Sequence, residues 1–337
     1  MQFGLTESQQ VLKNSAREFF PAECPPAEVR RIMETASAHD ANLWRKIAAQ
    51  GWCGIIIPED YGGLGNGMVE LAVSMEEIGR ALIPGPFLSA IFAGAVIAET
   101  AEDSFKRKYL PAIAAGELIA TVAIDKNFVP DAAVAGLILT TGLDGIYAFE
   151  SGVAITAMPA LDMTRQLYRI DTSNAHGIRI GSKDNFDRAV DIATMAMCAE
   201  MTGGMQKMLD QTVEYAKTRK QFGRPIGQYQ AVQMMCADML VLTESSRSAT
   251  YYAAYSLDRE TRKESSIAVS VAKSYAGDAY REVGNRAIQC HGGMGFTWEN
   301  DLHLYYRRSK ACEVMFGDAR THRERIAAAV IGQAAPW

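Results

Sequence analysis

Residues 187–219 read DRAVDIATMAMCAEMTGGMQKMLDQTVEYAKTR, with apolar side chains at every third or fourth position. That spacing is typical of an amphipathic helix, and the stretch is longer than most helices in globular proteins. Two stretches of similar length and periodicity follow it, at residues 229–258 and 266–289. The sequence therefore predicts that the chain from residue 187 onward forms a bundle of four or five helices.

The chain before residue 187 divides into a helical part and a part with short strands. Helical periodicity recurs in four segments, residues 5–20, 42–52, 68–82 and 105–117, and we expect Gly51 to cap the second of them. Between about residue 118 and residue 186, five short apolar runs are separated by Gly, Asp, Asn or Pro, with no helix between them. This pattern predicts a small antiparallel β-structure. The predicted domains are 1–117, 118–186 and 187–337.

Composition excludes several classes of function. Of the 337 residues, 48% are hydrophobic and 22% charged, as in ordinary soluble proteins, and a net charge of −5 does not favour nucleic acid as a partner. No apolar run is long enough to cross a bilayer, and the start MQFGLTESQQ has no signal-peptide pattern. The six cysteines form no CxxC pair and the five histidines are dispersed, which argues against a metal site. We expect a cytoplasmic protein with reduced thiols.

Two segments carry candidate binding residues. Residues 287–299, AIQCHGGMGFTWE, follow a long helix, whereas a dinucleotide-binding glycine loop follows a strand and opens a helix. The segment fits either a helix end with left-handed glycines or a ligand loop. Residues 218–230, TRKQFGRPIGQYQ, join two long helices, where Arg219 could pair with a phosphate and Phe222 could cover an apolar ring. A simple turn with a solvated arginine fits equally well.

Together, these segments resemble the acyl-CoA dehydrogenase family. The resemblance is carried by TRKQFGRPIGQYQAVQ and IQCHGGMGFTWENDLHLYYRRSK, and in the N-terminal half by LWRKIAAQGWCGIIIPEDYGGLG, EEIGRAL and YLPAIAAGE. It spans essentially the whole chain in the same order. It implies a mainly α fold with a small β-domain: an N-terminal helical domain, a truncated middle β-barrel and a C-terminal four-helix bundle. It also implies FAD as cofactor and acyl-CoA as substrate.

The resemblance also implies roles for individual residues at a subunit interface. In relatives, the matching positions contact the FAD bound by a neighbouring subunit. The cofactor-binding residues implied here are Arg219, Phe222, Gln230, Gln289, Gly292 and Gly293. Glycines suit such a place because backbone N–H groups can approach a diphosphate when no Cβ intervenes.

The catalytic base of the family is missing at both of its known positions. Dehydrogenation requires a carboxylate that takes the α-proton of the thioester. The two family positions correspond to Phe316 and Ala193, neither of which can accept a proton. Glu313 and Asp318 are the nearest candidates for a relocated base, although we expect Glu313 to pair with a local Arg or Lys. The loop that cradles the flavin ring in relatives also has no counterpart after residue 117.

These losses predict a subunit that serves FAD bound mainly by a related, longer chain that carries the base. Similar α2β2 acyl-CoA dehydrogenases act in bacterial degradation of steroid side chains. Two alternatives remain: a self-sufficient homo-oligomer with a relocated base, and a non-catalytic scaffold subunit. The resemblance further implies an electron-transfer flavoprotein as the electron acceptor.

Overall fold

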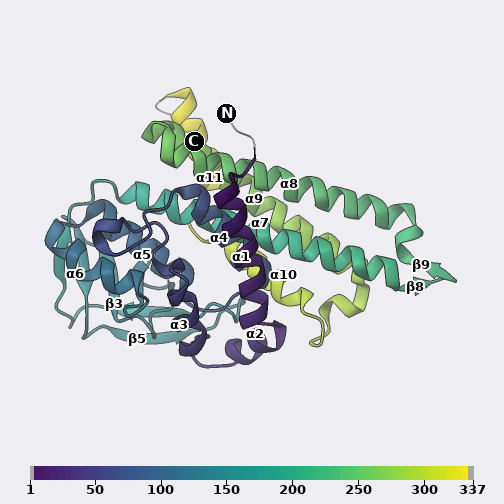
Figure 1. The fold of residues 1–337 in the computed structure, drawn as a ribbon, viewed down its shortest axis with the longest axis horizontal. Helices are drawn as coiled ribbons and strands as arrows, with labels where there is room; N and C mark the ends of the chain where they lie inside the picture. Colours follow the sequence, from purple (N-terminus) through teal and green to yellow (C-terminus); the bar gives the residue numbers. More distant parts are fainter. Residues whose placement is uncertain (1–3, 333–337) are drawn as a thin grey trace. The chain divides into compact units, whose positions relative to one another are not determined.

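The fold was analysed in a computed structural model that describes residues 4–332 (Figure 1). The chain divides into two compact units, which are described separately. The mixed unit comprises Ala22–Leu71 and Ile83–Ala193, and the bundle unit comprises Met1–Pro21, Ala72–Leu82 and Thr194–Trp337. The mainly helical fold class is confirmed, whereas the division into domains 1–117, 118–186 and 187–337 stays a prediction.

The mixed unit contains four helices that precede its strands. They are α2 (Pro26–Met33), α3 (Ala41–Ala49), α5 (Phe87–Thr100) and α6 (Asp103–Ala114). The predicted helix at residues 42–52 is α3, and it begins where Asp40 accepts hydrogen bonds from the backbone N–H groups of Asn42 and Leu43, both 2.9 Å long. Just past its end, Gly51 takes the left-handed conformation expected of a cap, with φ of 81°.

Helix α5 is absent from the predicted elements, and its surroundings explain why. Its sequence FLSAIFAGAVIAET is apolar on nearly every side, and twelve of its residues are buried. A helix surrounded by protein has no polar face, so it lacks the periodicity by which an amphipathic helix is recognised. Helix α6, in contrast, was predicted from residues 105–117.

The strands of the mixed unit form two small sheets. One has the order β1-β3-β4-β7 and the other β2-β6-β5. Their strands are β1 (Ala120–Ala123), β2 (Val129–Pro130), β3 (Leu137–Thr141), β4 (Ile146–Phe149), β5 (Ala154–Met158), β6 (Leu167–Asp171) and β7 (Ile178–Gly181). The prediction of purely antiparallel pairing was wrong for one pair, because β1 and β3 run parallel. The chain leaves β1 to form β2 in the other sheet, and this crossover returns it in the direction of β1.

The bundle unit consists of long helices, as predicted. Those lying wholly or mainly in it are α1 (Glu7–Glu23), α4 (Met68–Ala81), α7 (Phe186–Thr218), α8 (Gln230–Arg259), α9 (Arg262–His291), α10 (Leu302–Val314) and α11 (Ala319–Ile331). Figure 1 shows α8 and α9 running side by side, joined by a tight turn. A capping box fixes the start of α9, in which the Thr261 hydroxyl and the Glu264 carboxylate accept from each other's backbone N–H groups. Within residues 4–332, no helix is long and apolar enough to span a membrane.

Glycines allow α4 and α7 to cross at very short range. A Cβ on Gly79 would lie 2.0 Å from the carbonyl oxygen of Glu200, and one on Gly203 would lie 1.7 Å from that of Glu76. No other residue type fits at either position without moving a backbone. Close to this crossing, the Glu200 carboxylate accepts a 2.9 Å hydrogen bond from Arg308, and each of these residues is only 1% exposed. The core of the bundle unit therefore contains a buried ion pair.

Candidate functional site

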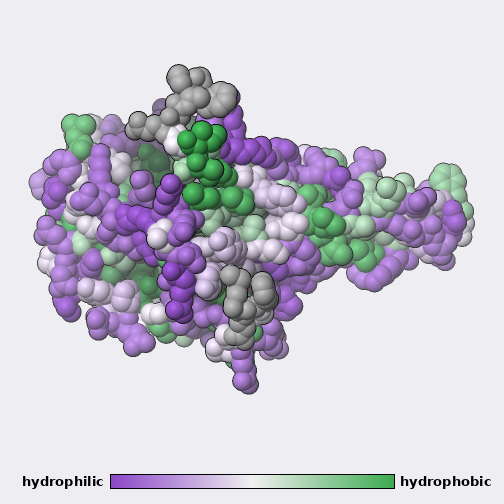
Figure 2. All heavy atoms as spheres, turned by 90° about the horizontal axis from the view of Figure 1, so that it is seen from above, coloured by the Kyte–Doolittle hydropathy of each residue, from purple (hydrophilic) through white to green (hydrophobic). Residues whose placement is uncertain are grey.

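A short hairpin connects α7 to α8 and carries the first candidate motif. Strands β8 (Lys220–Gln221) and β9 (Arg224–Pro225) pair through a two-residue turn of Phe222 and Gly223. Both turn residues have positive φ, 51° and 83°, which matches the twist of a tight hairpin. Phe222 is left 93% exposed. In the space-filling view, this end of the bundle unit shows both hydrophilic and hydrophobic surface (Figure 2).

Tyr229 braces the hairpin, a role that was missed from the sequence. Its hydroxyl donates a 3.1 Å hydrogen bond to the carbonyl oxygen of Gln221, and the Arg224 guanidinium lies 4.2 Å from the centre of its ring. Phe222 meets the same ring edge-on, with centroids 6.5 Å apart. These contacts of Tyr229 hold the hairpin in place, while the Phe222 ring stays exposed to solvent. The YQ dipeptide after the Gly-Arg-Pro turn is the signal that could have indicated it.

Arg219 and Gln230 flank the hairpin with exposed polar groups. The backbone of Arg219 is held, because its N–H donates to Tyr215 and its carbonyl accepts from Ile226, both at 2.8 Å. Among residues 4–332, its guanidinium forms neither an ion pair nor a hydrogen bond, and the same is true of the Gln230 amide. Both side chains are exposed. They are available to a ligand that approaches from outside the chain.

The second motif ends α9, so the interpretation as a helix end is confirmed. Gly292 is the C-terminal cap, with φ of 58° and ψ of −141°, and a short 3-10 helix at Gly292–Phe296 follows it. A Cβ added at Gly292 or Gly293 would meet nothing within 4 Å, so the backbone there faces open space. Gln289 is exposed in the last turn of α9. Contact of these residues with a diphosphate stays a prediction.

The structure brings the two motifs to the same end of the bundle unit. The rings of Tyr215 and His291 stack with centroids 4.2 Å apart, which joins the last turn of α7 to that of α9. On the other side, the Cys290 sulfur lies 3.9 Å from that of Met235 near the start of α8. Arg219 follows Tyr215 by one helical turn, and Gly292 directly follows His291. Residues about 70 positions apart in sequence thus frame one surface.

His291 has a structural role at this place. The His291 ring is buried and its Nδ1 lies 2.9 Å from the Ala287 carbonyl oxygen. Burial lowers the pKa of His291, which keeps the stacked ring neutral. Within the described part of the chain, no cluster of three His, Cys, Asp or Glu residues could hold a metal ion.

Hydrogen bonds fix the turn that holds Phe316, the first of the two positions predicted for the family base. Phe316 and Gly317 both have positive φ, 59° and 97°, between α10 and α11. The buried Lys273 ammonium donates hydrogen bonds to the carbonyl oxygens of Cys312, Glu313 and Gly317 at 2.8–3.0 Å. His322 Nε2 donates to the Phe316 carbonyl oxygen at 3.0 Å. Because two buried nitrogen donors fix the backbone, the turn keeps its shape with a side chain that cannot take a proton.

Ala193, at the other predicted base position, is buried in a helix. Glu313 and Asp318, the two candidates for a relocated base, each have a structural role. Ala193 is fully buried in α7. Glu313 forms an ion pair with Arg281, as expected from the sequence. Asp318 caps α11 by accepting from the Thr321 backbone N–H and hydroxyl, both at 2.8 Å, and the backbone bond is the main reason its pKa is lowered. A carboxylate held ionised as a cap is a weak proton acceptor.

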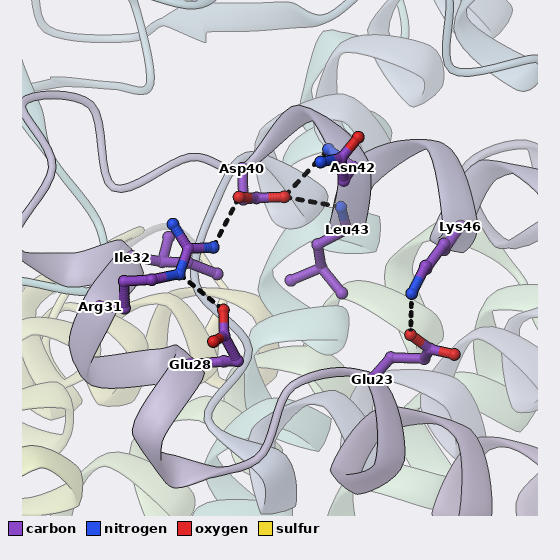
Figure 3. A pocket seen from close by; sticks show the side chains of 8 residues that line it. All are labelled: Glu23, Glu28, Arg31, Ile32, Asp40, Asn42, Leu43 and Lys46. Atoms are coloured by element: carbon purple, nitrogen blue, oxygen red, sulfur yellow. Dashed lines mark hydrogen bonds and ion pairs between the residues drawn. The ribbon is translucent and has the colours of Figure 1, made fainter.

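A polar cavity of about 250 Å³ lies elsewhere, between α2 and α3 in the mixed unit (Figure 3). Arg31 lies 2.7 Å from the carboxylates of both Glu28 and Asp40, and Lys46 pairs with Glu23. Both cations lining the cavity are therefore neutralised by neighbours. None of the predicted site residues lines this cavity. We assign it no role in the candidate site.

Comparison with known proteins identifies the family. The profile of the acyl-CoA dehydrogenase N-terminal domain matches residues 6–117, and that of the C-terminal domain matches residues 186–331. The chain is 32% identical to acyl-CoA dehydrogenase IpdE2 of Mycolicibacterium smegmatis, with 97% of this chain and 100% of that protein covered.

Solved structures share the whole fold. The ChsE4-ChsE5 complex from Mycobacterium tuberculosis matches with a TM-score of 0.91 at 25% identity, covering 99% of this chain and 100% of that one. The Tcur3481-Tcur3483 steroid ACAD G363A variant matches with a TM-score of 0.88 at 26% identity, covering 96% and 98%. Structures with FAD bound also adopt this fold. The chain belongs to the acyl-CoA dehydrogenase family, whose members are oxidoreductases that act on the CH–CH bond of acyl-CoA thioesters.

Proposed function

We propose that this chain is the base-deficient subunit of a heteromeric, FAD-dependent acyl-CoA dehydrogenase. The observation that carries the proposal is a contrast within the bundle unit. The surface framed by Arg219 and Gly292 presents exposed groups suited to FAD, namely the Arg219 guanidinium, the Phe222 ring and an open glycine backbone. At the same time, the family resemblance implies a base position at Phe316, which lies in a turn fixed by hydrogen bonds.

The chemical types of the exposed groups match the parts of FAD. A guanidinium without a partner pairs well with a phosphate, and an exposed aromatic ring can cover the adenine. The backbone at Gly292 and Gly293 has open space beside it, so a diphosphate could approach closely, and Gln230 and Gln289 add amide donors. We propose that these six residues, which lie on the surface of the chain, bind FAD held mainly by a partner subunit.

The proposal also holds that residues 4–332 do not complete a flavin site by themselves. The connection from β1 to β2 closes as a tight turn in which Asp125 accepts from the Asn127 backbone N–H at 2.8 Å. We propose that this short connection stands where the family resemblance implies a flavin-cradling loop. In the assembled enzyme, bound FAD would accept the hydride from Cβ of the acyl group. The proton acceptor for Cα would come from the partner, because Glu313 and Asp318 are engaged as an ion pair and a helix cap.

The substrate class follows from the relatives rather than from this chain alone. One solved structure of the same fold is described as a steroid ACAD, and it pairs two different chains. We propose a bulky, steroid-derived acyl-CoA as substrate and an electron-transfer flavoprotein as acceptor. A related, longer acyl-CoA dehydrogenase chain that carries the base is the expected partner.

The first experiment tests the need for a partner. The chain is purified alone and co-purified with a related, base-bearing chain from the same genome, and bound flavin and acyl-CoA oxidation are measured. We expect stoichiometric FAD and activity only in the complex. Full flavin loading and turnover by the chain alone would refute the proposal and support the self-sufficient homo-oligomer.

A second experiment tests the contribution of Arg219 to the cofactor. In the complex, Arg219→Ala should weaken FAD binding about 10- to 100-fold, the effect of losing a charged hydrogen bond. Lys217→Ala is the matched control, since Lys217 is an exposed cation in the last turn of α7 that pairs with Glu214 at 2.6 Å. Equal FAD affinity in both variants would instead indicate a scaffold subunit.

A further inference from the structure

The two small sheets of the mixed unit have four edges, and three of them are covered or blocked. Strand β1 is buried along its whole length, and β7 is extended by a bridge between Gly181 and Ala101. Strand β2 spans two residues and ends in Pro130, which has no N–H to donate. The fourth edge is β5, in which residues 154–157 are exposed. An exposed edge strand presents backbone groups to which another strand can bind.

Strand β6, the neighbour of β5, shows which backbone groups of β5 point outward. The N–H of Ile170 donates to the Lys126 carbonyl oxygen at 2.8 Å, and the Gln166 carbonyl oxygen accepts from the N–H of Asp131 at 3.1 Å. Both bonds leave the β6 chain on the side of β2, away from β5. Because successive residues of a strand direct their hydrogen bonds to opposite sides, the odd-numbered residues of β6 bond to β5.

The register of the pair assigns the outward groups to Ile155 and Ala157. Thr156 lies opposite Arg169, an odd-numbered residue of β6, so the N–H and C=O groups of Thr156 point toward β6. Those of Ile155 and Ala157, on either side of it, point away from the sheet. Within residues 4–332, no hydrogen bond to these outward groups is found. The edge is therefore an unused set of donors and acceptors that is symmetric about Thr156.

The side chains of β5 continue an apolar row of the sheet that is left uncovered at this edge. Ile155 lies opposite Ile170 and Ala157 opposite Tyr168, and both β6 residues belong to a buried hydrophobic cluster. Directly opposed residues lie on the same face of a sheet, yet Ile155 is 40% exposed. Residues 151–161 contain no charged side chain. Charge, a common protection of edge strands, is therefore absent from this one.

We propose that β5 pairs edge to edge with β5 of a second copy of this chain, in an antiparallel register centred on Thr156. In that register Ile155 of one copy lies opposite Ala157 of the other, so the outward N–H and C=O groups of both residues find partners. Thr156 lies at the two-fold axis and faces its own counterpart, a favourable cross-strand pair. The two three-stranded sheets then form one continuous sheet.

The lack of charge in β5 favours a second copy as the occupant. In a two-fold pair, each residue near the axis lies close to its own counterpart, so a charge in β5 would meet a like charge. A chain of different sequence is selected by complementary charges, and the net charge of −5 would favour a basic segment. Residues 151–161 offer such a segment nothing to pair with. Their composition is the one that self-pairing requires.

The first experiment measures self-association of the full-length chain by sedimentation velocity across the micromolar range. We expect a reversible monomer–dimer equilibrium, because a strand pair buries less area than a standard interface. Ile155→Lys places like charges beside the axis and should weaken the dimer at least about tenfold. Leu143→Lys is the matched control, since Leu143 is fully exposed in the turn between β3 and β4. A wild-type chain that stays monomeric, or association that Ile155→Lys leaves unchanged, would overturn the proposal.

A second variant tests the backbone contact without adding charge. Ala157→Pro removes one outward N–H and no hydrogen bond to β6, so it should also prevent dimerisation while circular dichroism shows a folded chain. If either variant fails to fold, hydrogen exchange of the wild-type chain decides. The Ile155 and Ala157 amides should gain protection as the concentration rises. Protection that appears only after a base-bearing chain is added would assign the edge to that chain and overturn the self-pairing.

The register is tested by cross-linking. In an antiparallel pair the two Thr156 Cα atoms lie about 4.5 Å apart, within the range of a disulfide, so Thr156→Cys should form an intermolecular bond at this position on mild oxidation. Ala154→Cys should not, because it lies opposite Met158 of the other copy. Peptide mass spectrometry distinguishes this bond from any made by the six native cysteines. Equal cross-linking of both variants would contradict the register.

These tests are independent of the proposed function, because they need neither FAD nor a partner chain. A failure of the strand pairing leaves the cofactor surface on the bundle unit untouched. Conversely, a chain that pairs through β5 and loads FAD fully by itself would refute the proposed function and keep this inference.

Discussion

Arg281 on α9 forms an ion pair with Glu313 in the last turn of α10, three residues before Phe316. One of the two carboxylates next to the predicted base position is thus bound to a cation. The pair is partly exposed, with Arg281 39% and Glu313 20% accessible, so its contribution to stability is modest. The role of Glu313 in this pair therefore distinguishes the heteromeric enzyme from the self-sufficient enzyme with a relocated base.

Glu313→Gln should lower the free energy of unfolding by about 0.5–1 kcal/mol and leave turnover of the complex unchanged. The reason is that Glu313 acts as the partner of Arg281 and not as a base. Chemical denaturation and acyl-CoA oxidation assays measure the two effects, with Glu324→Gln in the exposed Arg320 pair as the control. A loss of turnover of a hundredfold or more, typical of a missing general base, would revive the relocated base.

Gly292 and Gly293 allow backbone strain to be separated from cofactor binding. Gly292→Ala should destabilise the chain by about 1–3 kcal/mol, because φ of 58° with ψ of −141° is a region open mainly to glycine. Gly293→Ala should leave thermal unfolding nearly unchanged, since its φ is ordinary and an added Cβ would meet nothing within 4 Å. Both changes are compared by differential scanning calorimetry.

The informative result is FAD affinity of the Gly293→Ala complex. If a diphosphate approaches this backbone, the added methyl group should weaken FAD binding without loss of stability. Wild-type affinity in a folded complex would show that the loop does not approach the cofactor closely. Gly223→Ala is a poor control, because that residue also has positive φ.

Much of the fold was predictable because its long helices have apolar residues at three- and four-residue spacing. The segments 187–219, 229–258 and 266–289 show this spacing, and each largely corresponds to one helix. Helix α5 has no polar face, and β2 spans only two residues, so neither leaves a periodic pattern. The parallel pairing of β1 and β3 depends on a crossover between sheets, which no local spacing records.

In the candidate site, too, contiguous motifs were predictable from the sequence, whereas contacts between residues far apart in the chain were not. Arg219, Phe222 and the glycines were found because their motifs are contiguous in sequence. The stacking of Tyr215 on His291, which joins the two motifs, links residues on different helices. Lys273 could not be interpreted from sequence either, since a lysine in a helix is usually solvated, whereas this one is fully buried. Its three carbonyl partners come from residues 39 or more positions away.

The buried pair of Glu200 and Arg308 predicts a large effect from removing one charge. Arg308→Met should lower the free energy of unfolding by about 3–5 kcal/mol, because it leaves the Glu200 carboxylate buried without its cation. Arg323→Ala is the control, since that arginine pairs with Asp278 at the surface and is 61% exposed. Urea denaturation at neutral pH measures both variants.

The double variant Glu200→Leu with Arg308→Met should recover much of the loss, because an apolar pair needs no compensating charge. A double variant as unstable as Arg308→Met alone would mean that the pair stabilises the crossing of α4 and α7 in a way that hydrophobic contacts cannot replace.

His322 predicts how stability depends on pH. Its Nε2–H donates to the Phe316 carbonyl, while its buried Nδ1 has no hydrogen-bond partner among the described residues. Burial is the main cause that lowers its pKa from 6.5 to about 4, with Arg325 and Lys273 adding repulsion. The unfolded chain therefore takes up a proton near pH 6.5, whereas the folded chain does not until about pH 4. The stabilisation is complete above 6.5 and is lost as the pH falls toward 4.

We expect the free energy of unfolding to decrease by up to about 1.4 kcal/mol per pH unit in this window for this one group. His322→Gln keeps a donor for the Phe316 carbonyl and removes the titration, so its unfolding free energy should vary less with pH. The remaining dependence comes from His39 and His291, whose pKa values are also lowered by burial. Urea titrations at pH 7, 6 and 5 measure the slopes. Equal slopes in wild type and variant would show that His322 is protonated in the folded chain, and that the turn holding Phe316 is looser than its hydrogen bonds indicate.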